Sequence, residues 1–268
     1  MIYADELEFA RACAMRAGER IRRGTRDRYR VDIKPDQTPV TTIDRDVNAE
    51  FIEQVAARFP DDGVLGEEAS RDGRGPRTWV VDPIDGTQQL ILAIPVFMVS
   101  IALVEDGRPV VGVAYNPSTA ECYWAASGGG AYREGLPIRV STRDGELEPN
   151  TISGEGADAN PSELTSDTLL RVRFAPRLEA SPYRFPWPTV FSGCKVAEGS
   201  WDGDLYGRSA AYDVAALCVL VGEAGGKVTD RFGAEQRYDR PVEGCVVSNG
   251  LIHDELVQHW GLRSPARS

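Results

Sequence analysis

The sequence predicts a layered α/β fold made of two subdomains. Segments with helical and with strand periodicity intermix along the 268 residues without a strict βαβ alternation. Hydrophobic residues make up 42% of the chain and charged residues 26%, so the chain can bury a substantial core. The stretch 141–166 is polar and rich in Gly, Ser and Asp, and it predicts a boundary between subdomains 1–146 and 147–268.

Two amphipathic helices are expected near the N-terminus. Apolar residues recur at helical spacing within 5–23 and again within 42–58, and a Pro-Asp-Asp-Gly turn follows the second segment. The polar, Pro-containing stretch 29–39 between them predicts a loop or a hairpin. Residues 78–82 then form a short run of strand-favouring residues that ends at a proline.

The remainder of the chain alternates between strand and helix patterns. A β-meander is expected from 96 to 132, because strand-like segments flank turns rich in Asp, Gly, Asn and Pro. Further along, the predicted elements are a strand at 170–174, a helix at 211–223 ended by glycines, strands at 227–229 and 244–248, and a terminal helix.

The acidic balance of the chain argues against nucleic-acid binding. Its formal net charge is −11, which repels phosphates at long range unless bound cations invert the local charge. No apolar run approaches the roughly 18 residues that a membrane helix needs. The N-terminus also lacks the basic start and apolar stretch of a signal peptide. We therefore expect a cytoplasmic protein with no nucleic-acid and no membrane partner.

Cysteine and histidine usage narrows the possible chemistry. The five cysteines are scattered without a C-x-x-C pair, which predicts free, buried thiols in a reducing compartment. The two histidines, His253 and His259, lie six residues apart near the C-terminus, and we expect both on the surface of the terminal helix. Ser-His-Asp hydrolysis and histidine-rich zinc sites are therefore disfavoured. Catalysis must rely on carboxylates, hydroxyls, backbone groups or metal ions.

Three separated clusters concentrate acidic residues. They are Gly66-Glu67-Glu68, Asp82-Pro83-Ile84-Asp85-Gly86-Thr87 and Tyr212-Asp213-Val214-Ala215-Ala216. Asp82 ends an apolar strand, where a charge must be solvated, paired or bound to a cation. Asp85 can point back into the same pocket, and Thr87 supplies a hydroxyl at the expected start of a helix. Taken by itself, the cluster at 82–87 is also explained without a metal, as an Asp-Gly turn followed by a helix cap. With Glu67 and Asp213 as partners, the cluster favours a site for hard divalent cations and phosphate.

In these motifs the sequence resembles the inositol monophosphatase superfamily of Mg²⁺-dependent, lithium-sensitive phosphomonoesterases. The three clusters occur in the family's order and at about its separations, and Val40-Thr41-Thr42-Ile43-Asp44 and Glu223-Ala224-Gly225-Gly226 also fit. The likeness runs from the first helix nearly to the C-terminus. It implies the family's αβαβα sandwich, hydrolysis of a small-molecule phosphate ester, and a homodimer.

The resemblance also implies which residues bind metal. Glu67, Asp82 and the Ile84 carbonyl would hold one Mg²⁺. Asp82, Asp85 and Asp213 would hold a second Mg²⁺, and a third, weaker ion would share Glu67 and waters. Asp213 would thus be supplied by the second subdomain, and the other ligands by the first.

Phosphate binding and water activation follow from the same resemblance. The backbone N–H groups of Gly86 and Thr87 would bind the phosphate. Asp44 would orient the Thr87 hydroxyl, which together with Glu67 would position the attacking water, in agreement with two-metal hydrolysis.

The substrate-recognising part departs from the family. Tyr206 stands seven residues before Asp213, where inositol-cleaving members carry a carboxylate, and the usual Gly-Ser/Thr substrate loop is replaced near Trp187. A phenol and an aromatic-rich loop suit a ring or base better than a polyol. We therefore expect Tyr206 and Trp187 to set specificity, with a nucleoside or amino-nucleoside monophosphate preferred. The alternatives are an inositol or sugar phosphate, histidinol phosphate, simple packing of Tyr206 beside Leu205, and a non-catalytic metal- or phosphate-binding relative.

Overall fold

The computed structural model describes residues 2–144, 187–207, 209–242 and 244–263. Its helices are α1 (Ala4–Gly24), α2 (Thr42–Arg58), α3 (Thr87–Ile91), α5 (Thr189–Ala197), α6 (Ala211–Glu223) and α7 (His253–Arg263). Its strands are β1 (Val31–Ile33), β2 (Pro39–Thr41), β3 (Gly63–Gly66), β4 (Arg77–Asp85), β5 (Met98–Glu105), β6 (Arg108–Asn116), β7 (Glu121–Ala126), β8 (Ala131–Arg133), β9 (Leu136–Pro137), β10 (Gly203–Tyr206), β11 (Lys227–Thr229) and β12 (Cys245–Ser248).

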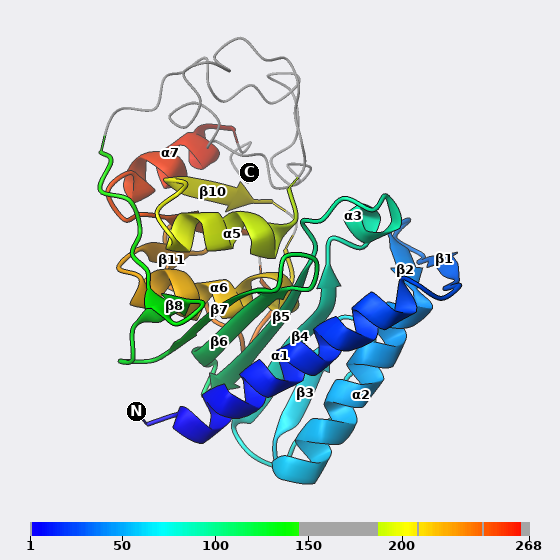
Figure 1. The fold of residues 1–268 in the computed structure, drawn as a ribbon. Helices are drawn as coiled ribbons and strands as arrows, with labels where there is room; N and C mark the ends of the chain where they lie inside the picture. The colour runs from blue at the N-terminus through cyan, green and yellow to red at the C-terminus, as the bar shows by residue number, and fades with distance from the viewer. Residues whose placement is uncertain (1, 145–186, 208, 243, 264–268) are drawn as a thin grey trace.

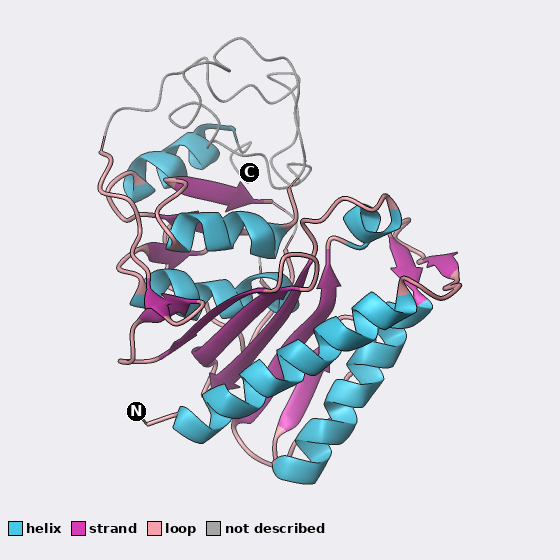
Figure 2. Ribbon diagram, viewed as in Figure 1, coloured by secondary structure: helices cyan, strands magenta, loops and turns pink. Residues whose placement is uncertain are grey.

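These elements stack in five alternating layers (Figure 1, Figure 2). Helices α1 and α2 cover one face of a seven-stranded sheet, and α5 and α6 cover its other face. A three-stranded sheet and then α7 follow on the far side of α5 and α6. The layered α/β fold predicted from the sequence is confirmed.

The large sheet is mixed, with the strand order β3-β4-β5-β6-β7-β8-β9. Only the pair β3 and β4 is parallel, and the other neighbours are antiparallel, as expected for a meander. The small sheet has the antiparallel order β10-β12-β11. A separate hairpin of β1 and β2 forms in the stretch expected to be a loop or hairpin.

Both faces of the large sheet are buried, so its strands are apolar on both sides. On β4, Val81 packs in the core under α1 and α2, while the preceding Val80 packs in the core under α5 and α6. The second core also contains residues of α6 and β12, so the two halves on either side of residue 146 share it. The boundary between the proposed subdomains lies outside the described residues, and the division stays a prediction.

Acidic side chains in the first turn hold the starts of α2 and α6. Thr41 caps α2, and a reciprocal capping box joins its side chain and backbone to Asp44. At α6, Asp213 in the first turn accepts a hydrogen bond from the backbone of Ala210. Helices α1, α2 and α6 match the predicted spans to within one residue.

Two local features differ from the sequence prediction. Strand β4 does not end at Asp82: it continues across Pro83 to Asp85, with a register irregularity between the two aspartates. An irregularity of this kind re-aims side chains, which is how both carboxylates reach one place. Helix α5 was not predicted, because its small and β-branched residues carry little helical signal; burial between the two sheets stabilises it.

His253 corrects the expectation that both histidines lie on the surface. Its side chain is fully buried at the start of α7, and its ring nitrogens bond the hydroxyls of Ser248 (2.8 Å) and Thr229 (2.9 Å). The terminal helix itself is confirmed. The predicted strand at 170–174 lies outside the described residues.

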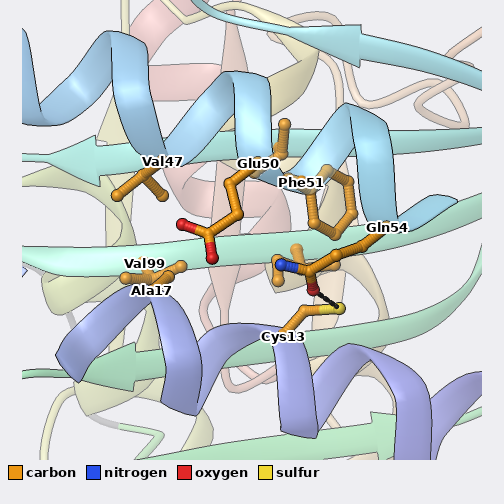
Figure 3. A pocket seen from close by; sticks show the side chains of 9 residues that line it. Cys13, Ala17, Val47, Glu50, Phe51, Gln54 and Val99 are labelled. Carbon is orange, nitrogen blue, oxygen red and sulfur yellow. Dashed lines mark hydrogen bonds between the residues drawn. The ribbon is translucent and has the colours of Figure 1, made fainter. Parts of the chain in front are cut away.

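The cysteines behave as predicted, with all five free and four of them buried. A hydrogen bond between α1 and α2 lies beside a small cavity: the Cys13 thiol donates to the Gln54 side chain at 3.0 Å, and the cavity holds about 10 Å³ (Figure 3). Among the described residues, no helix is long and apolar enough to cross a membrane.

Candidate active site

Three aspartates from two distant parts of the sequence converge at one end of the large sheet. Asp82 and Asp85 lie on the last residues of β4, and Asp213 lies in the first turn of α6. One carboxylate oxygen from each lies within 4.8 Å of the others. Asp82 and Asp85 are 2% and 7% exposed, so the charges sit largely out of water. The structure therefore brings together the acidic residues that the sequence singled out.

Backbone N–H groups fix the orientation of these carboxylates. Asp85 accepts hydrogen bonds from Thr189 (3.2 Å) and Val190 (2.8 Å) at the start of α5. Asp82 accepts one from the backbone of Ile84 at 2.9 Å. The remaining lone pairs of these carboxylates are available to a cation.

Glu67 completes the acidic cluster from the end of β3. The Lys34 ammonium lies between Glu67 and Glu68, with its nitrogen 2.7 Å from Glu67 Oε1 and 2.5 Å from Glu68 Oε1. Sequence reasoning missed Lys34, which lies between β1 and β2. Its available signal was that it is one of only three lysines in the chain.

Burial and mutual repulsion raise the pKa values of the three aspartates. Burial raises the pKa of Asp82 well above its usual range, and the charges of Glu67, Asp85 and Asp213 raise it further. Burial likewise raises the pKa of Asp85 and of Asp213, although backbone hydrogen bonds to each partly oppose the rise. Burial lowers the pKa of Lys34, but its contacts with Glu67 and Glu68 outweigh this effect and raise it.

This cluster fits a divalent cation. Buried carboxylates that repel one another are stabilised by a cation placed among them. The donors are all oxygen atoms, the ligands of hard cations such as Mg²⁺, and no histidine or cysteine belongs to the group.

A hydroxyl and a carboxylate lie beside the cluster in contact with each other. The Thr87 hydroxyl lies 3.0 Å from Asp44 Oδ1 and 3.1 Å from the Ile84 carbonyl oxygen. The second oxygen of Asp44 is held by the backbone N–H (2.9 Å) and the hydroxyl of Thr41. Asp44 is fully buried, and burial raises its pKa, while the hydrogen bonds from Thr41 and Thr87 oppose that rise.

Gly86 shapes the backbone between the metal-site aspartates and α3. Its φ of 95° lies in the left-handed region, and a Cβ there would lie 2.8 Å from Pro188 Cγ. Any other residue would be strained and would collide with the segment before α5. The assignment of the Gly86 and Thr87 N–H groups to phosphate stays a prediction.

The two residues expected to set specificity have different surroundings. Tyr206 is 1% exposed on β10, and its hydroxyl lies 2.9 Å from Ser192 Oγ. The ring packs in the core with α5 and α6, whereas Leu205 packs on the other side of β10 with Ile252 and Leu256. Tyr206 is therefore buried, but not beside Leu205, and any effect on a substrate would act through Ser192 and α5. Trp187 is partly buried beside Pro188 and stacks on Phe191, with ring centroids 5.5 Å apart.

Comparison with known proteins decides the family. The family model for the inositol monophosphatase family matches residues 3–261. The chain belongs to this family. It is accordingly a phosphoric monoester hydrolase that acts on small phosphate esters.

Individual relatives cover nearly the whole chain. A histidinol-phosphatase of Mycobacterium tuberculosis is 37% identical, over 94% of this chain and 96% of that protein. A fructose-1,6-bisphosphatase/inositol-1-monophosphatase of Thermotoga maritima is 33% identical, over 82% of this chain and 81% of its own length. Among solved structures, the extragenic suppressor protein suhB of Bartonella henselae matches with a TM-score of 0.79 and 28% identity, covering 96% of this chain and 98% of that chain.

Proposed function

We propose that this inositol monophosphatase family member hydrolyses its phosphate ester with two Mg²⁺ ions and an attacking water. The convergence of Asp82, Asp85 and Asp213 beside Thr87 and Asp44 carries the proposal. Glu67, Asp82 and the Ile84 carbonyl would hold one ion, and the three aspartates the other. A third, weaker ion would share Glu67. When bound, such ions lower the pKa of water and neutralise charge on the leaving oxygen.

The chain's own residues would orient the nucleophile. The Thr87 hydroxyl has one proton and two acceptors within reach, the Asp44 carboxylate and the Ile84 carbonyl. An ionised carboxylate is the stronger acceptor, so the proton goes to Asp44. The lone pairs of Thr87 Oγ are then free to accept a hydrogen bond from water. Glu67 would accept the second hydrogen bond from this water, and a lone pair of the water oxygen would face the phosphorus.

Phosphate would be held by backbone groups at the β4–α3 turn. The left-handed backbone at Gly86 turns the chain there, so the N–H groups of Gly86 and Thr87 are not used by β4. Backbone N–H groups carry no charge to neutralise and suit a phosphate already bridged by cations.

We further propose that the leaving alcohol carries an aromatic ring or base. Trp187 directly precedes Pro188, the residue in close approach to Gly86, so its backbone adjoins the predicted phosphate position. Its ring also approaches Trp201, with centroids 5.8 Å apart, which makes a small aromatic surface with Phe191. Such a surface favours stacking with a ring over hydrogen bonding to a polyol. Histidinol phosphate and nucleoside monophosphates fit this class better than inositol 1-phosphate, and the relative from M. tuberculosis is a histidinol-phosphatase.

Phosphate release from these three substrates tests the proposal. We expect Mg²⁺-dependent release that EDTA abolishes, with kcat/KM higher for a ring-bearing substrate than for inositol 1-phosphate. Trp187→Leu should lower kcat/KM for the ring-bearing substrate about tenfold and change that for inositol 1-phosphate little. Trp124→Leu is the matched control, because Trp124 stacks on Tyr132 and does not belong to this aromatic surface.

The outcomes separate the parts of the proposal. Activity that survives metal removal contradicts the cation mechanism. A preference for inositol 1-phosphate, or equal losses in both tryptophan variants, contradicts the aromatic substrate class and leaves the cation mechanism intact. The homodimer implied by the family is tested by measuring the molar mass of the protein by light scattering after size-exclusion chromatography. The cytoplasmic location stays a prediction.

A further inference from the structure

A basic segment at the end of α1 stands out in this acidic protein. Residues 20–30 hold six arginines and one aspartate, although the whole chain has a net charge of −11. Arg20, Arg22 and Arg30 each have a partner: Asp46 for the first, Tyr115 and Pro117 for the second, and Asp32 for the third. Within the described part of the chain, Arg23, Arg26 and Arg28 have neither an ion pair nor a side-chain hydrogen bond.

The helix dipole explains only part of this segment. Arg22 and Arg23 lie in the last turn of α1, where positive charge is favourable. Helix α1 ends at Gly24, so Arg26 and Arg28 lie beyond it. A different feature must account for unpaired charge on the connection toward α2.

That feature is a cavity of about 200 Å³ between the end of α1 and the start of α2. Arg23 and Arg28 line it, together with Tyr29 and Thr42. Arg20 also lines it but is already paired with Asp46. The volume is below that of pockets for drug-sized ligands, which favours a small ion or metabolite.

The neighbouring cavity between the same helices serves as a contrast. It holds only about 10 Å³ and is lined largely by apolar side chains, with Glu50 as its charged residue (Figure 3). Arg20, which lines the larger cavity, lies 2.8 Å from Asp46 and 3.7 Å from Glu50 of the smaller cavity, so its charge is already paired. Unpaired positive charge therefore lines the larger cavity and not the smaller one.

We propose that the larger cavity, between α1 and α2, is a second anion site that binds a phosphate dianion. Guanidinium groups pair with phosphate oxygens in a bidentate manner, and Arg23 and Arg28 supply two that are unpaired. The Tyr29 hydroxyl, which has no hydrogen-bond partner among the described residues, supplies a further donor. Two carboxylates also line the cavity, Asp27 and the Arg20-paired Asp46, and their charge disfavours highly charged polyanions and favours a single phosphate group.

The position of this site connects it to the catalytic residues. Thr42 and Ile43 line the cavity, and the next residue, Asp44, contacts Thr87. Gly24 allows α1 to approach Ile43 closely, since a Cβ there would lie 2.8 Å from Ile43 Cγ1. A bound phosphate would therefore join the end of α1 to the helical turn that carries Asp44.

Calorimetric titration of the metal-free protein tests the site. In EDTA the acidic cluster of the active site repels anions, so phosphate binding there is suppressed. We expect saturable 1:1 binding of inorganic phosphate. Arg23→Gln and Arg28→Gln should each weaken it about tenfold or more, the worth of one charge-assisted hydrogen bond. Arg26→Gln is the matched control, because it removes an unpaired arginine of the same segment that does not line the cavity, and it should leave affinity nearly unchanged.

Two further ligands define the chemistry. Glycerol 3-phosphate, whose hydrolysis is not expected in EDTA under the proposed function, shows whether a phosphate ester or free phosphate binds more tightly. Either result supports the site. Succinate binding as tightly as phosphate overturns the assignment to phosphate. An absence of saturable phosphate binding, or equal losses in the Arg23, Arg26 and Arg28 variants, overturns the site itself.

Discussion

Asp85 accepts hydrogen bonds from the first two backbone N–H groups of α5, at 3.2 Å from Thr189 and 2.8 Å from Val190. A carboxylate at the end of β4 thus anchors a helix that lies more than 100 residues away in the sequence. The same helix carries Phe191, on which Trp187 stacks. Helix α5 therefore fixes the position of the aromatic surface relative to the acidic cluster.

Asp82→Asn should abolish activity while preserving the fold. Asp82 is proposed to contact both cations, so we expect kcat/KM to fall by roughly a thousandfold or more. In EDTA the variant should melt a few degrees higher than the wild type, because one of the mutually repelling charges is gone. Thermal melts and phosphate release check both effects, with the exposed Asp72→Asn as the matched control. Retention of more than about a tenth of wild-type kcat/KM contradicts the two-cation assignment.

Thr87→Ala should lower kcat far more than it changes KM. The substitution removes the hydroxyl that donates to Asp44, so the water loses an acceptor that orients it. We expect a decrease in kcat of roughly 10- to 1,000-fold at saturating Mg²⁺, and partial recovery in Thr87→Ser. An unchanged kcat in Thr87→Ala would mean that the hydroxyl only stabilises the turn.

Lys34→Gln should make the enzyme easier to load with Mg²⁺. The Lys34 ammonium forms ion pairs with both Glu67 and Glu68 in this structure, so an incoming cation competes with it for Glu67. We expect the Mg²⁺ concentration for half-maximal activity to fall roughly two- to tenfold. Lys227→Gln, which removes an exposed lysine paired with Asp254, is the control. A higher Mg²⁺ requirement would show that Lys34 aids cation binding instead.

Li⁺ should inhibit the enzyme at the Asp82, Asp85 and Asp213 site. It has the same hard-oxygen preference as Mg²⁺ but half the charge, so it leaves the phosphate and leaving group less stabilised. Steady-state kinetics should show inhibition competitive with Mg²⁺ or uncompetitive with substrate. Insensitivity to Li⁺ at tens of millimolar would contradict the proposed construction of this site.

His253 should make the fold less stable in mild acid. Burial lowers its pKa from 6.5 to about 4, and the charge of Lys227 adds to this effect. The unfolded chain therefore binds a proton that the folded chain does not, and stability is lost as pH falls from about 6.5 toward 4. We expect roughly 2 to 3 kcal/mol of this loss to come from His253 between pH 7.5 and 4.5.

Denaturant titrations of wild type and His253→Gln isolate that contribution. Other groups titrate in both proteins, so the difference between the two pH profiles reports His253. The variant should be less stable at neutral pH, because its contacts with Ser248 and Thr229 are altered, but should lose less stability on acidification. Parallel profiles would show that the buried imidazole does not titrate in this range.

Local sequence signals specified much of the fold. Helical periodicity predicted α1, α2 and α6 nearly to the residue, together with the turn and glycine residues that follow α2 and α6, because these signals act within a few turns of the chain. Strand runs separated by Asp, Gly and Pro turns gave the meander for the same reason. Helix α5 was missed because its stability comes from burial between two sheets, which no local pattern records.

For the site, the sequence by itself determined the chemistry. It supplies acidic residues in three clusters, the Thr87 hydroxyl in the same cluster as Asp82 and Asp85, and only two histidines. Only the tertiary structure decided their geometry, because residues 82 and 213 meet through the packing of α6 against the sheet. Here Gly112 lets β6 approach the helix: a Cβ at this position would lie 2.5 Å from the Ala216 carbonyl oxygen. The structure also decided that Tyr206 and His253 are buried, since exposure depends on which layers cover a residue. Composition and spacing are local properties, whereas distance and burial arise only when all layers pack together.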